Sequence, residues 1–164
     1  MVVDEDSQAW FAKREDIDWV TDQLGRVPKI PFRTVTRSVD GYPIVIELAP
    51  YDQDQTPQSN RFWLVERRLV SAVARLESQG GVRRAASAVD PGALDLANQS
   101  YRSGRHELPH MFGRGVGGAR AGVKCLHAHV AFHLAGGFTP VGVWTMWWLY
   151  QSDRQLLTTL IGPV

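Results

Sequence analysis

The chain has 164 residues, 44% of them hydrophobic, so we expect a single domain over residues 1–164 that folds around one packed core. Eighteen basic and seventeen acidic residues give a formal net charge of +1, which excludes a strong general attraction to nucleic acid or to an anionic membrane. The single cysteine excludes an intramolecular disulfide, as is typical of proteins in a reducing compartment.

Two segments bear on where the protein resides. The N-terminal "MVVDEDSQAW" is acidic and lacks the basic and apolar regions of a signal peptide, so we expect a cytoplasmic protein. The most apolar run, "VGVWTMWWLY", has ten residues, whereas a membrane-spanning helix needs about 20. No membrane span is predicted.

The first part of the chain predicts a helix followed by a small sheet. Residues 1–14 are expected to be poorly ordered. Beyond them, Ile17, Val20 and Leu24 share one face of a short helix that Gly25 ends. The segment "FRTVTRSVDGYPIVIELA" then predicts a hairpin, because two runs rich in β-branched residues flank an Asp-Gly turn signal. The segment "RFWLV" predicts a third strand.

Four more helices are predicted after the sheet, each with apolar residues at helical spacing. A glycine-rich loop is expected at residues 104–121, between the second and the third of them. The four helices are predicted to begin near Arg67, Pro91, Val123 and Pro140. The fold class that follows is α+β: a small antiparallel sheet, made of the hairpin and a third strand, packed with four to five helices.

The segment "GVKCLHAHVAFHLAGG" at residues 122–137 gathers the cysteine and three of the five histidines. On a helix, Cys125, His129 and His133 form one stripe, because residues four apart share a face. If the chain before His129 is extended, Cys125, His127 and His129 share a face instead. Either set presents soft or borderline ligands that suit zinc, iron or copper, with a fourth ligand from elsewhere or from water.

Two other interpretations of this segment stay open. A buried cysteine often serves as a small hydrophobic residue, and a half-buried histidine often donates to a nearby carbonyl. Alternatively, Cys125 is a nucleophile with a histidine as its base, near a helix N-terminus and beside Lys124.

The preceding "GRGVGGARAGVK" suggests an anion site at a helix N-terminus, with Arg114, Arg120 and Lys124 adding positive charge. It does not match a Walker A motif, because Cys125 stands where serine or threonine is required. It does not match a dinucleotide fingerprint either, because no buried strand precedes it. The alternative is a surface loop that glycine makes easy to bend.

Three tryptophans in the last helix, Trp144, Trp147 and Trp148, have two explanations. They fill the core of a small domain, or they form the surface of a homodimer or another protein-interaction site. The apolar side of this helix is predicted to consist of Val143, Met146, Trp147, Tyr150 and Leu157.

The order of several segments resembles one known family. These are "QLGRVP", "RSVDGYPIVIELAP", "FWLVERRLVSAVARLESQGG" and "GVKCLHAHVAFHLAGG" followed by "TPVG". Together they resemble the bacterial, largely actinobacterial family called domain of unknown function 501. The resemblance extends from about Asp16 to Gly142. It implies no established activity.

The resemblance does imply a comparison at the cysteines. Family members resemble "RCPxGxP" where this chain has Ser38, and "LTCPxL" where it has Glu66. The third family cysteine corresponds to Cys125, and the family histidines correspond to His127, His129 and His133. In typical members this set implies a zinc or iron–sulfur site.

In this chain the implied site is altered. Glu66 can still bind zinc or iron together with the histidines, whereas Ser38 replaces a thiolate poorly, and an iron–sulfur cluster is not expected with one cysteine. Either the site is re-formed or the metal is lost. The sequence thus predicts a metal-binding or formerly metal-binding domain. A phosphate- or polyphosphate-type anion-binding protein and an interaction module are the alternatives, and enzymatic activity is left open.

Overall fold

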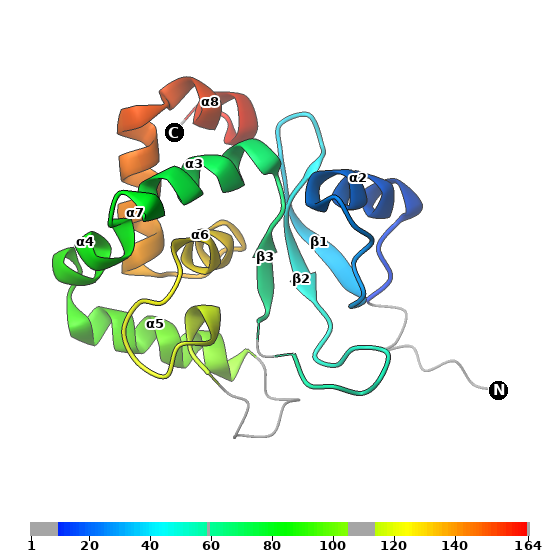
Figure 1. The fold of residues 1–164 in the computed structure, drawn as a ribbon, viewed down its shortest axis with the longest axis horizontal. Helices are drawn as coiled ribbons and strands as arrows, with labels where there is room; N and C mark the ends of the chain where they lie inside the picture. The colour runs from blue at the N-terminus through cyan, green and yellow to red at the C-terminus, as the bar shows by residue number, and fades with distance from the viewer. Residues whose placement is uncertain (1–9, 59, 105–113, 164) are drawn as a thin grey trace.

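The computed structural model describes residues 10–58, 60–104 and 114–163. This part of the chain confirms the α+β class, with one three-stranded antiparallel sheet and seven α-helices. Figure 1 shows the sheet between helix α2 on one side and the other helices on the opposite side. None of the described helices is both long and apolar enough to cross a bilayer.

Helix α2 (Arg14–Leu24) forms where the sequence predicts it, and Gly25 ends it with a φ of 69°. Its inward side carries Val20, which has no exposed surface. This side chain joins a core cluster against one face of the sheet, made with Phe32, Ile46, Leu48 and Val65. The amphipathic spacing of the helix therefore produces the packing it predicts.

A buried carboxylate ties the same helix to the sheet. Asp16 accepts hydrogen bonds from Thr34 Oγ1 at 2.8 Å and from the two terminal nitrogens of Arg37 at 2.9 and 2.7 Å. The hydrogen bonding by Arg37 lowers the pKa of Asp16 below its ordinary value of 3.8, against the opposing effect of burial.

The sheet consists of β1 (Phe32–Arg37), β2 (Pro43–Leu48) and β3 (Phe62–Leu64), in that order and antiparallel. This confirms the hairpin and the third strand. All six residues of β2 are buried, because helices cover both faces of the sheet. Its one acid, Glu47, is ion-paired with an arginine on either side.

The remaining helices build the larger side of the molecule. Apolar residues from β2, β3 and these helices form a second and larger core cluster. The helices are α3 (Arg67–Ser78), α4 (Gly81–Ala88), α5 (Pro91–Ser103), α6 (Leu126–Leu134), α7 (Pro140–Ser152) and α8 (Arg154–Ile161). A short 3-10 helix, η2 (Val116–Gly118), lies in the described part of the glycine-rich loop.

Helix α4 is absent from the sequence prediction, which places four or five helices where seven are described. Gly80 ends α3 with a φ of 78°, but Gly81 begins the next helix directly. The residues that α4 buries are Gly81 and Ala85. Because both are small, the segment lacks the large apolar residues that mark a helix face. A Cβ at position 81 would lie 2.5 Å from the Leu76 carbonyl oxygen, so the close packing requires glycine.

The last predicted helix is in fact two helices. The backbone leaves the helical region at Asp153, whose carboxylate accepts the N–H of Leu156 at 3.0 Å and starts α8. The predicted apolar side is wrong for Val143 and Trp147, which are 44% and 54% exposed. The residues that α7 buries are Val141, Gly142, Thr145 and Leu149. Since apolar residues surround the helix, their spacing does not identify the inward side.

Candidate functional site

Helix α6 begins one residue after Cys125. Cys125 has extended backbone, with φ −153° and ψ 125°, and helical geometry begins at Leu126. Val123 is therefore outside the helix that was predicted to start there. As a result, Cys125 does not continue the helical stripe of His129 and His133 that the sequence suggests.

Instead, the structure groups three side chains around the start of α6. The Sγ of Cys125 lies 3.9 Å from Nδ1 of His127. The same Nδ1 lies 3.3 Å from Oε1 of Glu77. Within the described ranges, this is the one group of three or more His, Cys, Asp or Glu side chains whose ligand atoms all lie within 4.8 Å of one another. All three residues are half-buried.

Helix α3 positions this group. Glu77, in its last turn, accepts the backbone N–H of Leu126 at 2.6 Å and so binds the first turn of α6. The carbonyl oxygen of Val70 lies 3.0 Å from Nε2 of His127. Because a carbonyl can only accept, Nε2 carries the proton, and this bond turns Nδ1 toward Cys125 and Glu77.

The glycine-rich loop packs against the same place. Gly117 has a φ of 67°, and a Cβ there would lie 3.4 Å from Cys125 Cβ and 3.2 Å from Ala128 Cβ. Glycine thus supplies both the left-handed backbone and the close approach to the start of α6. A cavity of about 300 Å³ adjoins the group, lined by Cys125, His127, Ala128 and residues of β3.

The protonation of His127 reflects its neighbours. Burial of the ring acts to lower its pKa, but hydrogen bonding to Cys125 and to the Val70 carbonyl and the charge of Glu77 outweigh it. The resulting pKa is about 9. In the metal-free protein, His127 is therefore an imidazolium at neutral pH, and its Nδ1–H points at a thiol and a carboxylate.

The other two histidines of α6 have different surroundings. His129 is fully buried, and its Nδ1 lies 2.7 Å from Oγ1 of Thr139. Its Nε2 is buried without a hydrogen-bond partner among the described residues, as is Nδ1 of His133. Burial lowers the pKa of His129 to about 4. Neither residue belongs to the group at Cys125.

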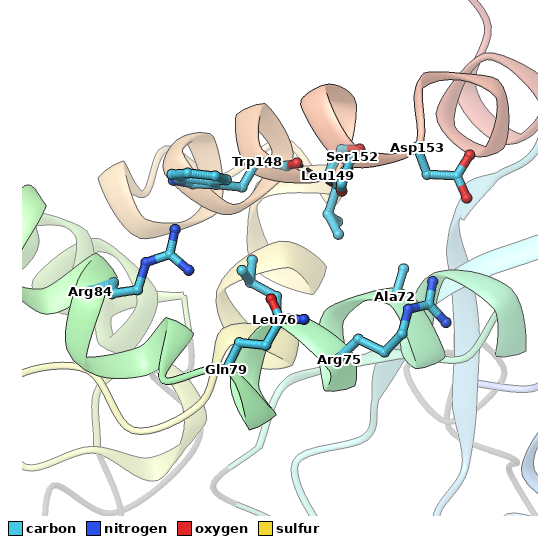
Figure 2. A pocket seen from close by; sticks show the side chains of 9 residues that line it. All are labelled: Ala72, Arg75, Leu76, Gln79, Arg84, Trp148, Leu149, Ser152 and Asp153. Carbon is cyan, nitrogen blue, oxygen red and sulfur yellow. Dashed lines mark hydrogen bonds between the residues drawn. The ribbon is translucent and has the colours of Figure 1, made fainter.

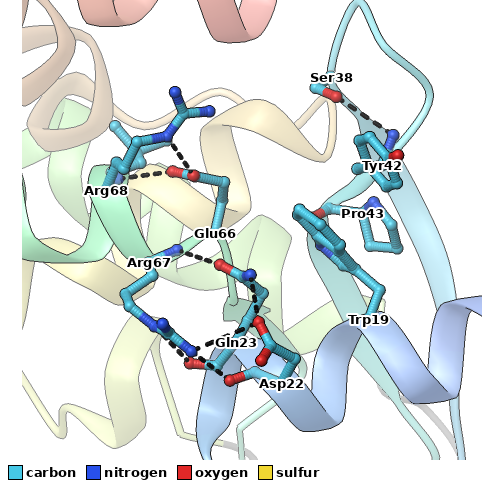
Figure 3. A network of polar contacts seen from close by, with 10 residues as sticks. Trp19, Asp22, Gln23, Ser38, Tyr42, Pro43, Glu66, Arg67 and Arg68 are labelled. Atoms are coloured by element: carbon cyan, nitrogen blue, oxygen red, sulfur yellow. Dashed lines mark hydrogen bonds and ion pairs between the residues drawn. The ribbon is translucent and has the colours of Figure 1, made fainter.

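Glu66 is also placed away from that group. Its buried carboxylate accepts the N–H of Leu69 at 2.7 Å and the Nε–H of Arg68 at 2.8 Å, so it caps α3 (Figure 3). Ser38 accepts the backbone N–H of Tyr42 at 3.1 Å within the hairpin turn. Among the described residues, the side-chain polar contact of Cys125 is with His127 and not with Ser38 or Glu66.

Glu77 is the site residue that the sequence prediction missed. Its segment "ARLESQGG" ends in two glycines, and Glu77 has no ligand spacing to Cys125, which is 48 positions later. The one available signal is a carboxylate near the end of a helix, where it interacts unfavourably with the helix dipole unless another group binds it. The N–H of Leu126 and the ring of His127 are those groups.

One backbone donor of the predicted anion site is already occupied. The N–H of Leu126, at the start of α6, already binds the Glu77 carboxylate. A carboxylate of the chain thus holds a backbone donor that an external anion would need. Arg114, Arg120 and Lys124 are all exposed, and their binding of an anion stays a prediction.

The three tryptophans of α7 also differ in exposure. Trp144 and Trp148 are half-buried, and their rings lie 5.9 Å apart. Trp147 is exposed and lines an apolar groove with Val143, Met146 and Tyr150. A homodimer or other partner at this surface stays a prediction.

A family model described as "Protein of unknown function (DUF501)" matches residues 34–99 and 91–147. The matched part extends from β1 into α7 and includes Glu77, Cys125 and His127, although it begins at residue 34 and not near Asp16. No curated protein and no solved structure matches the chain.

Proposed function

The chain belongs to the DUF501 family, whose function is unknown, and we propose that it binds a transition metal ion through Glu77, Cys125 and His127. The observation that supports this most is the convergence of one thiol, one imidazole nitrogen and one carboxylate oxygen within 4.8 Å. Thiolate, imidazole and carboxylate are all zinc ligands, and zinc lies about 2.0–2.3 Å from such atoms. Small side-chain movements would bring the three atoms onto one ion.

The surroundings of His127 favour this role. Metal-binding histidines usually donate their second ring N–H to a carboxylate or a backbone carbonyl, which fixes the orientation of the ring. Here Nε2–H donates to the Val70 carbonyl, and Nδ1 is left to face Cys125 and Glu77. Glu77 is held in turn by the N–H of Leu126. Two of the three proposed ligands are therefore oriented before any metal arrives.

The donor set also limits which metal fits. One sulfur, one nitrogen and one oxygen ligand suit zinc or iron(II), whereas an iron–sulfur cluster requires more thiolates. A tetrahedral ion would keep a fourth position for water or another ligand, as catalytic zinc sites do. The adjoining cavity of about 300 Å³ gives room for that ligand.

Metal binding would compete with a proton. The ion requires a thiolate and an imidazole with a free Nδ1, whereas Nδ1 of His127 is protonated below its pKa of about 9. The affinity of the proposed site for zinc would therefore increase as the pH rises toward 9.

The test uses the 164-residue chain without a histidine tag. We expect about one equivalent of zinc or iron in the purified protein by elemental analysis, and a cobalt(II)–thiolate absorption band when cobalt replaces it. Cys125→Ser should abolish the band, and His127→Gln and Glu77→Gln should weaken zinc binding by about tenfold or more. His133→Gln, on the same helix but outside the group, is the matched control. If added zinc leaves both the melting temperature and the cobalt spectrum unchanged, the proposal is wrong.

A second candidate uses the same atoms without a metal. A sulfur 3.9 Å from an imidazole nitrogen, beside a cavity, is also the arrangement of a cysteine nucleophile with its histidine. With a strong chelator present, this candidate predicts fast alkylation of Cys125 by iodoacetamide and a much slower reaction in His127→Gln. Equal rates in the two proteins would exclude it.

A further inference from the structure

A polar cleft lies between helices α3, α4 and α7, apart from the Cys125 group. Its volume is about 250 Å³. Figure 2 shows Arg84 of α4 below Trp148 of α7 at one end and Arg75 of α3 below Asp153 at the other, with Leu76 and Leu149 between them. Gln79, which follows α3, also lines the cleft. Ala72, Leu76 and Leu149 supply its apolar surface. Two cations that face one small cleft raise the question of what neutralises them.

Arg84 is held in a defined orientation. Its guanidinium lies 4.3 Å from the centre of the Trp148 ring and 5.7 Å from that of Trp144. A guanidinium that stacks on an aromatic ring uses its flat face, so the N–H groups in its plane stay available. These donors form a planar fork that fits the two oxygens of a carboxylate or phosphate. Stacking thus prepares Arg84 for an oxyanion at little entropic cost.

The two arginines of the cleft are not neutralised by an ion pair within the described residues, in contrast to six other arginines of the chain. Six arginines form ion pairs with carboxylates, namely Arg14, Arg33, Arg37, Arg61, Arg67 and Arg68. Within the described residues, neither Arg75 nor Arg84 has such a pair. The one described acid that lines the cleft, Asp153, accepts the N–H of Leu156 and so caps α8, and it forms no ion pair with either arginine.

The side chains that line the cleft indicate which type of ligand fits it. The hydroxyl of Ser152 already donates to carbonyl oxygens of its own helix, so the donors that face the cleft are Arg75, Arg84 and the Gln79 amide. The apolar surface can hold a short hydrocarbon or aromatic body. The volume of about 250 Å³ is below the range of about 300–1,000 Å³ typical of drug-sized ligands.

We propose that this cleft binds a small organic oxyanion, a phosphate monoester or a carboxylate, whose charged group pairs with Arg84 and whose apolar part rests on Leu76 and Leu149, while Arg75 adds positive charge from the other end of the cleft. This site is separate from the proposed metal site, because it shares no residue with Glu77, Cys125 and His127. Either proposal can fail without the other.

Calorimetric titration of the full chain tests this proposal. Phenyl phosphate and benzoate represent the two oxyanions, inorganic phosphate lacks the apolar part, and phenol lacks the charge. We expect binding of phenyl phosphate, benzoate or both, and weaker binding of inorganic phosphate and phenol. Binding of only one organic anion would identify the charged group that the site prefers.

Substitutions then locate the bound ligand. Arg84→Gln should weaken binding by about tenfold, because it removes charge-assisted hydrogen bonds, and Arg75→Gln should weaken it by a smaller factor, because it removes a positive charge at the other end of the cleft. Arg83→Gln, one position from Arg84 and outside the cleft, removes the same charge and should change the affinity little. Since Arg75 is exposed, its variant keeps the test valid even if Arg84→Gln disturbs the packing on Trp148.

Three results would overturn the proposal. The first is the absence of heat and thermal shift with both organic anions at several millimolar. The second is unchanged affinity in Arg84→Gln. The third is equal loss of affinity in Arg83→Gln, which would show that net charge alone attracts the anion.

Discussion

Two histidines in the first turn of α6 are in opposite states. His127, at the start of the helix, is half-buried, contacts Cys125 and Glu77, and has a pKa raised to about 9. His129 is two positions later, fully buried, and has a pKa lowered to about 4. The sequence alone places His129 in both predicted ligand sets and His127 in only one of them. Partner groups and burial, and not the residue type, therefore decide what each histidine can do.

The two imidazoles also differ in their contacts. His129 fills space in the core and makes one hydrogen bond, to Thr139, while its Nε2 has no partner among the described residues. His127 has both nitrogens next to polar groups. A core histidine should tolerate an apolar replacement of similar size, whereas a functional histidine should not.

The largest effect expected from this contrast is on stability. His129→Ala should lower the free energy of unfolding by about 2–4 kcal/mol, because it leaves a cavity in the core. His129→Leu is the control and should cost less than about 1.5 kcal/mol, since it retains most of the volume. Chemical denaturation of the metal-free proteins measures both. If leucine is as damaging as alanine, the imidazole nitrogens of His129 have a role that packing does not explain.

The pH dependence of the free energy of unfolding should reflect the titration of both histidines. For His129, the unfolded chain binds a proton near pH 6.5 and the folded chain only near 4, so stability falls as the pH drops through this window, by about 3 kcal/mol. For His127, the folded chain keeps its proton up to about pH 9, so its contribution is full below 6.5 and is lost as the pH rises to 9.

Metal-free protein should thus be most stable near pH 6.5. Denaturation series at each pH in wild type, His129→Leu and His127→Gln measure this. The leucine variant should lose the decline on the acid side, and the glutamine variant should lose the decline on the alkaline side. Asp16 does not interfere, because its lowered pKa affects stability only below about 3.8. A profile that is flat from pH 4 to 9 in wild type would contradict the contrast between the histidines.

Much of the fold could be predicted because it depends on local signals. The α2 helix, the hairpin and the start of α5 at Asp90 each have apolar spacing or a turn or capping residue in the sequence. Helix α4 and the break at Asp153 could not be predicted so simply. The first packs through glycine and alanine, and the second interrupts a helix that is apolar all round.

The candidate site was predictable only in part, for a similar reason. The sequence brings Cys125 and His127 together because they are two residues apart. Glu77 joins them through the packing of α3 on α6, which no spacing in the sequence encodes. Glu66 was the predicted acid, yet its carboxylate binds the first turn of its own helix. As with the two histidines, the neighbouring groups decide what each glutamate can do.

Replacing Glu66 tests whether it is a helix cap and, in contrast to Glu77, not a metal ligand. Glu66→Ala should cost about 1 kcal/mol of stability, because the N–H of Leu69 loses its cap. Glu66→Gln keeps an acceptor and should cost less. Neither variant should change the zinc or cobalt titration. A loss of metal binding in Glu66→Gln that equals the loss in Glu77→Gln would restore Glu66 as a ligand.

Replacing Glu77 should have the smallest effect on stability and a specific effect on His127. In Glu77→Gln the amide oxygen still accepts the N–H of Leu126, so we expect a change of less than about 0.5 kcal/mol. The carboxylate charge is gone, however, and the pKa of His127 should fall part of the way from about 9 toward 6.5.

Cys125→Ser should lower the pKa of His127 further, since hydrogen bonding to Cys125 raises this pKa more than the charge of Glu77 does. NMR titration of the imidazole resonances in metal-free protein ranks the two variants. If Glu77→Gln leaves the pKa of His127 unchanged, the carboxylate serves only to cap α6 and is not available to share a metal with the imidazole.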